Sequence, residues 1–437
     1  MKKLLFILLL TLPFFGFGQS WEKTFGGTDY DDGRSVQQTN DGGYIICGWT
    51  HSYGNGDGDV YLIKTNENGI YQWSQTFGGS SGDGGRIVQQ TNDGGYIICG
   101  DTESFGNGDR DIYIIKTDEY GDSLWTKKFG GINKEEGYHI QQTTDGGYIF
   151  CGRTESFGNV IISKPDIYIV KIDENGIEEW YKTFGGVGWE VGYSIQQTND
   201  GGYIICGDTE SNGNVDVYVI KTDEYGDSLW TQTYGSSGVN WEVGNTIHQT
   251  IDGGYFISGQ SGSSTNGVID RDILLIKTDG NGNELWYKTF GEINMIDVGN
   301  FGQQTSDGGY IVTGYKEDSN QDQDVYILKT DEYGDSLWTK KFGGLENDKS
   351  FSIQQTTDNG YIICGYTESF GNLYPDIYVI KTDSQGNITS TFNIPISSNK
   401  KSQKVVDMLG RDVNPQQNTP FIEIYDDGST EKKIIIE

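Results

Sequence analysis

Short runs of apolar or alternating residues, separated by turns rich in Gly, Asn and Asp, recur along most of this chain. In the first unit the runs are Arg34–Thr39, Tyr44–Gly48, Val60–Thr65 and Tyr71–Phe77, and each has the length and composition of a β-strand. The second and third runs are apolar on both faces, which is typical of strands in a sheet that is covered on both sides. The pattern predicts four strands per unit and no helix, and the complete absence of alanine supports this.

This unit recurs seven times between Trp21 and Ile394. Its most constant turn, D-G-G-Y, follows the first strand, and the Asp positions are 41, 93, 145, 200, 252, 307 and 358, the last copy reading D-N-G-Y. Four strands repeated at this period form one blade of a β-propeller. The first strand keeps Gln and Thr in every copy, which suits the innermost strand beside a water-filled channel. The predicted fold class is therefore all-β, a seven-bladed β-propeller of four-stranded blades.

The two ends of the repeat region predict how the ring closes. Trp21–Gly27 carries the full signature of the fourth, Trp-bearing strand, whereas the last copy, Asn387–Phe392, has Ser390 in place of the Trp. We therefore predict that the N-terminal strand completes the last blade, because this removes the exposed sheet edges. The five cysteines share one site in the second strand and are expected to be free, since equivalent sites on neighbouring sheets are too far apart for a disulfide.

Two segments outside the repeats predict export. A basic start, the apolar run Leu4–Phe15 and small residues at Gly16 and Gly18 are typical of a signal peptide over residues 1–18, which is too short for a membrane span. Nothing later in the chain is apolar enough to be a transmembrane span, so we expect a propeller over residues 19–395 that is soluble and outside the cytoplasm.

The segment 396–437 departs from the repeat. It resembles the type A C-terminal sorting domain of the type IX secretion system, and the residues that carry this resemblance are Lys404, Asp407, Gly410, Arg411, Tyr425, Gly428, Lys432 and Lys433. The resemblance implies a small β-sandwich that the secretion machinery recognises at the outer membrane. It also implies that the protein is either released or anchored at the cell surface.

Charge limits the ligand classes. The formal net charge of −32 at pH 7 argues against nucleic acid, whose phosphates would be repelled. Cations, basic proteins and neutral glycans remain. The repeats themselves resemble secreted bacterial β-propeller repeat proteins that carry D-G-G-Y and W-x-x-T-F-G-G and are often labelled lectin-like. We expect a monomeric binding or scaffolding propeller directed at a glycan or a basic protein. The alternative is a polysaccharide hydrolase or lyase that uses carboxylates, and it should show a polar cluster confined to part of the ring.

Variation between the copies is concentrated in the connections from the fourth strand to the next first strand and from the second strand to the third. In a propeller both sets open on one face, which we call the variable face, and we expect function there because scaffolds carry function on loops. An acidic residue precedes the first strand in every copy. Either the seven acids form a ligand-binding ring around the channel, or each accepts hydrogen bonds within its own turn, and we favour the second interpretation. These acids are Asp31, Asp83, Glu135, Glu190, Glu242, Asp297 and Asp348.

Two further patterns belong to this face. Asp-x-Asp precedes the third strand in four copies, as Asp57/Asp59, Asp109/Asp111, Asp270/Asp272 and Asp322/Asp324. Two carboxylates are too few ligands for Ca²⁺, so we favour the interpretation that these residues cap the third strand. The alternative is a Ca²⁺ site whose remaining ligands are backbone carbonyls. We expect no other cofactor. Trp49, Trp189 and Trp241 lie outside the repeated Trp site. An exposed Trp ring beside carboxylates is suited to stacking against a sugar. The alternative is that these Trp side chains pack their own loops onto neighbouring loops.

Overall fold

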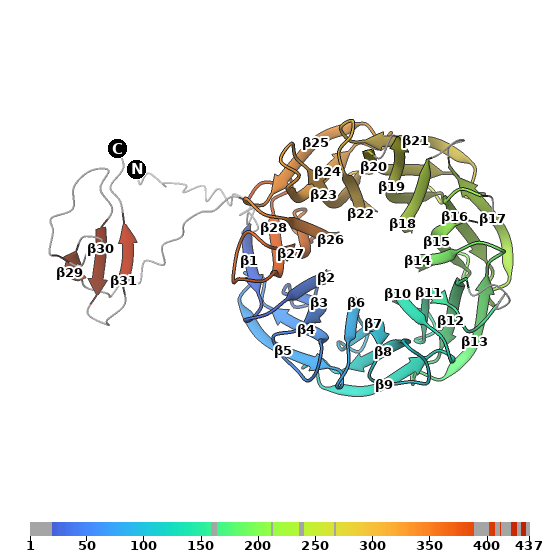
Figure 1. The fold of residues 1–437 in the computed structure, drawn as a ribbon, viewed down its shortest axis with the longest axis horizontal. Coiled ribbons are helices and arrows are strands. Elements are labelled where there is room, and N and C mark those ends of the chain that lie inside the picture. Colours follow the sequence, from blue (N-terminus) through green and yellow to red (C-terminus); the bar gives the residue numbers. More distant parts are fainter. Residues whose placement is uncertain are drawn as a thin grey trace, which may run out of the picture. The chain divides into compact units, whose positions relative to one another are not determined.

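The computed structural model describes residues 20–158, 164–210, 213–235, 240–265, 268–388, 402–406, 411, 421–425 and 430–433. Up to residue 388 these residues form seven four-stranded antiparallel sheets, arranged as blades around a central channel (Figure 1). The predicted seven-bladed, all-β propeller is confirmed. The described part of the chain contains no helix, and so no helical segment that could cross a membrane.

The strands follow one another from the channel to the rim within each blade. The innermost strands are β2 (Asp31–Gln38), β6 (Asp83–Gln90), β10 (Glu135–Gln142), β14 (Glu190–Gln197), β18 (Trp241–Gln249), β22 (Asp297–Gln304) and β26 (Asp348–Gln355). The second strands are β3 (Tyr44–Thr50), β7 (Tyr96–Thr102), β11 (Tyr148–Thr154), β15 (Tyr203–Thr209), β19 (Tyr255–Thr265), β23 (Tyr310–Glu317) and β27 (Tyr361–Thr367). The third strands are β4 (Asp59–Thr65), β8 (Asp111–Thr117), β12 (Asp166–Ile172), β16 (Asp216–Thr222), β20 (Val268–Thr278), β24 (Gln323–Thr330) and β28 (Asp376–Thr382). The outermost strands are β5 (Tyr71–Phe77), β9 (Ser123–Phe129), β13 (Glu178–Phe184), β17 (Ser228–Tyr234), β21 (Glu284–Phe290), β25 (Ser336–Phe342) and β1 (Trp21–Phe25).

The innermost strands begin earlier than the sequence predicted, since β2 starts at Asp31 and not at Arg34. Gly48 on β3 permits this, because a Cβ there would overlap the carbonyl oxygen of Asp32. The pairing of β2 with β3 then shifts between Gly33 and Ser35, so that Arg34 has no partner residue on β3. This β-bulge recurs at the same position in all seven blades.

The hydrophobic core lies between neighbouring blades. One cluster joins Ile45 and Leu62 of the first blade to Ile98 and Ile115 of the second, and all four are fully buried. The outer-strand Trp of each blade packs against the first Tyr of the next blade's second strand. Because each interface uses the same residues, each blade is held mainly by its two neighbours.

The strand β1 completes the last blade, as predicted. It pairs antiparallel with β28, with Trp21 opposite Lys381. Trp21 is only 9% exposed, and its ring centroid lies 5.6 Å from that of Tyr44 in the first blade. Between the inner strands, the amide N–H of Gln38 donates to the side-chain oxygen of Gln354 at 2.6 Å. The last interface therefore repeats the contacts of the others, and the ring is closed.

The D-G-G-Y turns form the constant face of the propeller. In the first blade, the carboxylate of Asp41 accepts hydrogen bonds from the Thr39 hydroxyl, from the Gly43 amide and from the buried Lys64 ammonium. Burial alone would raise the pKa of Asp41, but the hydrogen bonds from Thr39 and Lys64 hold it below its usual value. The same Lys–Asp pair is present in every blade. These repeated residues build the scaffold.

The five cysteines are buried and free, as predicted, at Cys47, Cys99, Cys151, Cys206 and Cys364. A Cβ added at Gly85 would overlap the sulfur of Cys47. The thiol therefore fills space that a glycine of the next blade leaves open, which explains a small apolar side chain at this site.

The chain divides into the compact units Met1–Thr389 and Ser390–Glu437, whereas the sequence placed the boundary at residue 395. The second unit contains one antiparallel sheet of β29 (Ser402–Val406), β30 (Phe421–Tyr425) and β31 (Thr430–Lys433), in that order. Of the sorting residues, Lys404 and Arg411 are exposed, and Tyr425, Lys432 and Lys433 lie in strands. Asp407, Gly410, Gly428 and the signal peptide lie outside the described residues.

Candidate functional site

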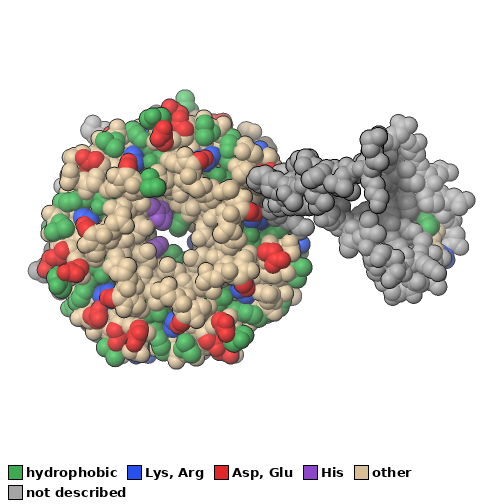
Figure 2. All heavy atoms as spheres, turned by 180° about the vertical axis from the view of Figure 1, so that it is seen from behind, with side chains coloured by type: hydrophobic (Ala, Val, Ile, Leu, Met, Phe, Trp, Pro, Cys, Tyr) green, Lys and Arg blue, Asp and Glu red, His purple; other side chains and the backbone are tan. Residues whose placement is uncertain are grey.

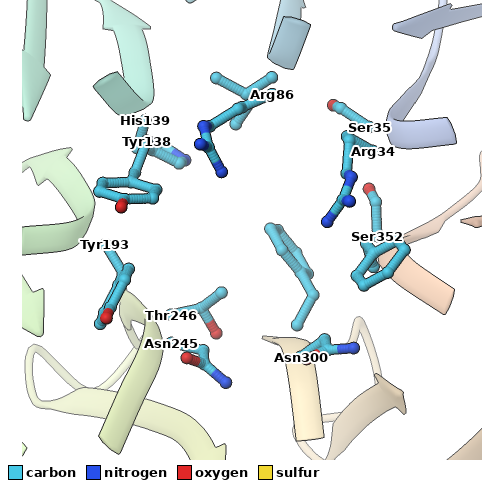
Figure 3. Close-up of a pocket in the computed structure, with 13 residues that line it drawn as sticks. Arg34, Ser35, Arg86, Tyr138, His139, Tyr193, Asn245, Thr246, Asn300 and Ser352 are labelled. Carbon is cyan, nitrogen blue, oxygen red and sulfur yellow. The ribbon is translucent and has the colours of Figure 1, made fainter. Parts of the chain in front are cut away.

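The extra residue of each β-bulge lines the central channel. β-Bulges commonly re-aim a side chain, and here seven of them do so around one opening. These residues are Arg34, Arg86, Tyr138, Tyr193, Asn245, Asn300 and Phe351. Figure 3 shows the arginines, tyrosines and asparagines among them distributed around the same space. Because they lie near the start of the innermost strands, where the loops of the variable face enter, we call this region the channel mouth.

The channel mouth encloses a cavity of about 260 Å³. It is completed by the residues that follow the bulged positions, which are Ser35, Ile87, His139, Thr246, Phe301 and Ser352. Its lining includes two arginines and no carboxylate, although the chain has 63 acidic and 31 basic residues. Figure 2 shows one face of the ring, on which histidine side chains are visible in the channel wall and acidic side chains are spread over the outer part. The mouth therefore differs in charge from the rest of the molecule.

Both arginines are held from two sides. A terminal nitrogen of Arg34 lies 2.5 Å from a carboxylate oxygen of Asp32, and the guanidinium lies 4.2 Å from the ring centroid of Phe351. The Arg86 Nε donates to Asp101 at 2.8 Å, and its guanidinium lies 4.7 Å from the ring centroid of Tyr138. A guanidinium has five N–H donors, so these contacts fix its position and leave donors for a ligand.

Glu136 is the centre of a charged network beside the mouth, and it is only 4% exposed. It pairs with Arg110 at 2.9 Å, with Lys134 at 3.0 Å and with Arg153 at 2.8 Å. It also lies 3.9 Å from Arg86 and accepts the Tyr138 hydroxyl at 2.7 Å. Burial would raise the pKa of Glu136, but Tyr138 and the neighbouring cations lower it to about 2. The network is confined to the second and third blades, so the blades differ in charge beside the mouth.

Two histidines on innermost strands and one aspartate on the second strand β15 have perturbed pKa values. Burial lowers the pKa of His139 to about 3 and that of His248 to about 4, so both rings are neutral at pH 7. Nδ1 of His139 is buried without a hydrogen-bond partner in the described part of the chain. Burial, followed by the charge of Glu210, raises the pKa of Asp208 to about 7, and its Oδ1 is likewise buried without such a partner. Polar atoms of this kind are candidates for ligand contact.

The seven recurring acids, which the sequence placed before the first strands, are the first or second residues of the innermost strands. All seven are at most 3% exposed, and none lines the channel mouth; they are Asp31, Asp83, Glu135, Glu190, Glu242, Asp297 and Asp348. The carboxylate of Asp31 accepts the Gly27 amide and the Ser52 hydroxyl, both at 2.7 Å. Five of the other six acids likewise accept a backbone amide of their own loop, and Glu242 accepts the Ser261 hydroxyl of β19 at 3.4 Å. The favoured interpretation as turn acceptors fits these contacts, because the side chains turn into the blades and away from the channel.

The Asp-x-Asp pairs also serve the loops that contain them. Asp59 and Asp111 accept backbone amides of Asn55 and Asn107 in their own loops, and Asp324 pairs with Lys341 at 2.6 Å. The first members, Asp57 and Asp109, are exposed, whereas Asp270, Asp272 and Asp322 are half-buried. No cluster of three or more potential metal ligands is present in the described ranges. These contacts fit strand capping, and calcium binding stays a prediction.

The three tryptophans differ in exposure. Trp189 is 41% exposed and lies immediately before β14, with the Arg153 guanidinium 6.0 Å from its ring. Trp241 is the half-buried first residue of β18, and the Arg271 guanidinium lies 5.0 Å from its ring. Trp49 is half-buried, and a Cβ at Gly84 of the next blade would overlap its ring. Trp189 is the most exposed of the three, and Arg153, which lies by its ring, also pairs with Glu136 beside the mouth.

Sequence reasoning missed the channel mouth because its residues occupy an unspecified position of the repeat pattern. A signal was nevertheless present. The propeller has five arginines: Arg34 and Arg86 line the mouth, Arg110 pairs with Glu136 beside it, and Arg153 and Arg271 lie by the rings of Trp189 and Trp241. The repeat itself uses lysine, so arginine marks the positions that depart from the scaffold.

Comparisons with known proteins give information on the fold and none on the site. No family model and no curated protein sequence matches this chain. Among solved structures, the polysaccharide lyase Uly1 is similar with a TM-score of 0.52 and 12% identity, over 82% of this chain and 91% of that chain. Chaetomium thermophilum Sqt1 bound to the N-terminus of the ribosomal protein L10 gives a TM-score of 0.46 and 9% identity, over 82% and 99% of the two chains. Puromycin hydrolase gives a TM-score of 0.49 and 9% identity, over 92% of this chain and 62% of that chain. At such identities the likeness is one of propeller fold.

Proposed function

We propose that this protein is an exported binding propeller that holds a saccharide at its channel mouth. The observation that carries this proposal is the ring of seven bulged positions, where a uniform scaffold presents Arg, Tyr, Asn and Phe in place of one repeated residue. Guanidinium and amide groups hydrogen-bond to hydroxyls, and aromatic rings pack against the C–H faces of sugars. A saccharide longer than one unit would extend from Tyr138 over Arg153 to the exposed ring of Trp189.

Trp189→Ala is expected to weaken saccharide binding by about 1–3 kcal/mol, because an exposed aromatic surface is lost from the binding path. Its melting temperature should stay within a few degrees of wild type. A glycan array with the mature protein, with and without calcium, selects the saccharide, and calorimetry measures the change. Trp241→Ala is the matched control, since Trp241 is less exposed and should affect stability more than binding. Unchanged binding by the Trp189 variant, or an array without any retained glycan, contradicts the proposal.

We also propose that residues 396–437 deliver the propeller across the outer membrane, which rests on the sorting resemblance of the tail. A chain that ends at residue 395 is expected to fold with an unchanged melting temperature, because none of the strands described after β28 belongs to the seven sheets of the ring. It should accumulate in the periplasm, as measured by cell fractionation with a periplasmic marker as the control. Delivery of the truncated chain to the surface or medium at the normal level contradicts the assignment.

A second candidate function is cleavage of the bound polysaccharide. It is favoured by the charged network beside the mouth, and by Asp208, whose raised pKa of about 7 is suited to a general acid. The two functions are separated by incubating the retained glycan with the protein and following its chain length. A binder leaves the length unchanged, whereas an enzyme shortens the glycan and loses this activity on Asp208→Asn.

A further inference from the structure

We propose that the channel mouth selects saccharides that carry a carboxylate, and that Arg34 and Arg86 recognise this group. The inference rests on the proposed saccharide binding and names the chemical class of the ligand as uronic-acid-containing glycans. It revises the expectation from net charge, which favoured cationic or neutral ligands.

The first argument is the local charge. The chain carries a formal charge of −32, yet the lining of the mouth contains two guanidinium groups and no carboxylate. Figure 3 shows Arg34 and Arg86 extending toward the same opening from neighbouring strands, β2 and β6. Each guanidinium is paired with a carboxylate outside the lining, Asp32 or Asp101, and its remaining N–H donors are available to an anionic group in the opening.

The second argument is geometric. Asp32 lies behind Arg34 and Asp101 behind Arg86, while Phe351 and Tyr138 flank the two guanidinium planes. These contacts reduce the rotamer freedom that either side chain would lose on binding. A planar fork held in this way matches the two oxygens of a carboxylate and forms charge-assisted bonds that a hydroxyl group cannot form.

The third argument distinguishes a sugar acid from a simple inorganic anion. The side-chain amides of Asn245 and Asn300 donate to the carbonyl oxygens of Gly299 at 2.9 Å and Ser350 at 2.8 Å. Their side-chain oxygens are then oriented as acceptors, which suit hydroxyl groups and would repel a bare anion. With Tyr193 also in the wall, the mouth combines acceptors, an aromatic surface and cations, as a sugar acid requires.

The test measures binding of uronate oligosaccharides by calorimetry at physiological ionic strength, where the Debye length is about 8 Å and the long-range repulsion from the acidic surface is screened. The probes are oligogalacturonate and oligomannuronate, the same oligosaccharides after reduction of their carboxyl groups, and dextran sulfate. We expect at least one uronate to bind and its reduced form to bind roughly 10- to 100-fold more weakly.

The variants locate the effect. Arg34→Gln should weaken uronate binding by about the same factor as carboxyl reduction and should not weaken the reduced form further. Arg34→Lys should recover part of the loss, because it keeps the charge and loses the fork. Lys182→Gln removes a positive charge from β13 on the rim and should change nothing. A melting curve for each variant confirms that it is folded.

The outcomes separate this inference from the function on which it rests. Equal binding of the uronate and its reduced form, or uronate binding that is insensitive to Arg34→Gln, overturns the inference and leaves saccharide binding in place. Dextran sulfate that binds as tightly as the uronates, and in an Arg34-dependent way, overturns the selectivity for carboxylate. If no saccharide of any kind binds, on this panel or on a glycan array, both the inference and the proposed function fail.

Discussion

Deletion of Trp21–Gly27 is expected to lower the stability of the propeller more than any single substitution in it. The deletion removes β1 from the last blade, exposes the edge of β28 and leaves Tyr44 of the first blade without its Trp partner. Loss of a buried Trp alone costs about 3–5 kcal/mol, and the ring also loses its closure. Chemical denaturation and thermal melting of the mature chain with and without residues 21–27 measure the effect.

Trp21→Ala and Trp189→Ala form the control pair for this prediction. Both replace the same side chain, but Trp21 is 9% exposed at a blade interface and Trp189 is 41% exposed on the variable face. The first substitution should be strongly destabilising, and the second should be close to neutral. A deletion variant that melts at the wild-type temperature would show that β1 does not close the ring in solution.

Glu136→Gln is expected to destabilise the folded state by about 3–5 kcal/mol at pH 7. The substitution removes the negative charge at the centre of the network and leaves Arg86, Arg110 and Arg153 without their shared partner. Removal of one member of a buried charge network is costly because charges that depend on it are left uncompensated. Arg86 and Arg110 keep Asp101, whereas Arg153 has no other ion-pair partner in the described part of the chain. Urea denaturation at pH 7 measures the difference in the free energy of unfolding.

The pH dependence of this difference supplies an internal check. The pKa of Glu136 falls from an ordinary value of 4.5 to about 2 in the folded state. Its contribution is therefore complete above about pH 4.5 and is lost as the pH falls toward 2, so wild type and variant should converge in that window. Glu103→Gln is the matched control, because Glu103 pairs with Arg110 but is 38% exposed, and it should cost less than about 1 kcal/mol. A Glu136 variant as stable as this control would contradict the network's role.

The residues of the repeat carried most of the fold prediction. The strand Tyr71–Phe77 has the predicted bounds, and the displaced strand at Trp21 closes the last blade, because both depend on local pattern and on the count of copies. The start of β2 could not be predicted in the same way. It depends on the close approach of Asp32 and Gly48, which is a contact between strands that no period in the sequence reveals.

The candidate site was harder to predict, for the same physical reason. An acid such as Asp31 recurs in every copy and so looks important, but recurrence selects for residues that hold each loop together. The mouth residues Arg34 and Tyr138 have no common chemistry, and only the β-bulge places them at equivalent points. Trp189 and Trp241 stand in the same W-E-V-G motif and still differ in environment, because Trp241 joins β18 and pairs with Gly262.

A crystal structure of the mature propeller soaked with trigalacturonate, or with whichever uronate binds most tightly, tests the binding site most directly. We expect electron density for one sugar unit in the channel mouth, with its carboxylate contacting Arg34 or Arg86 and its neighbouring unit directed toward Arg153 and Trp189. Density on the constant face or along the outer strands, with the mouth free of ligand, would contradict the assignment of function to this end of the channel.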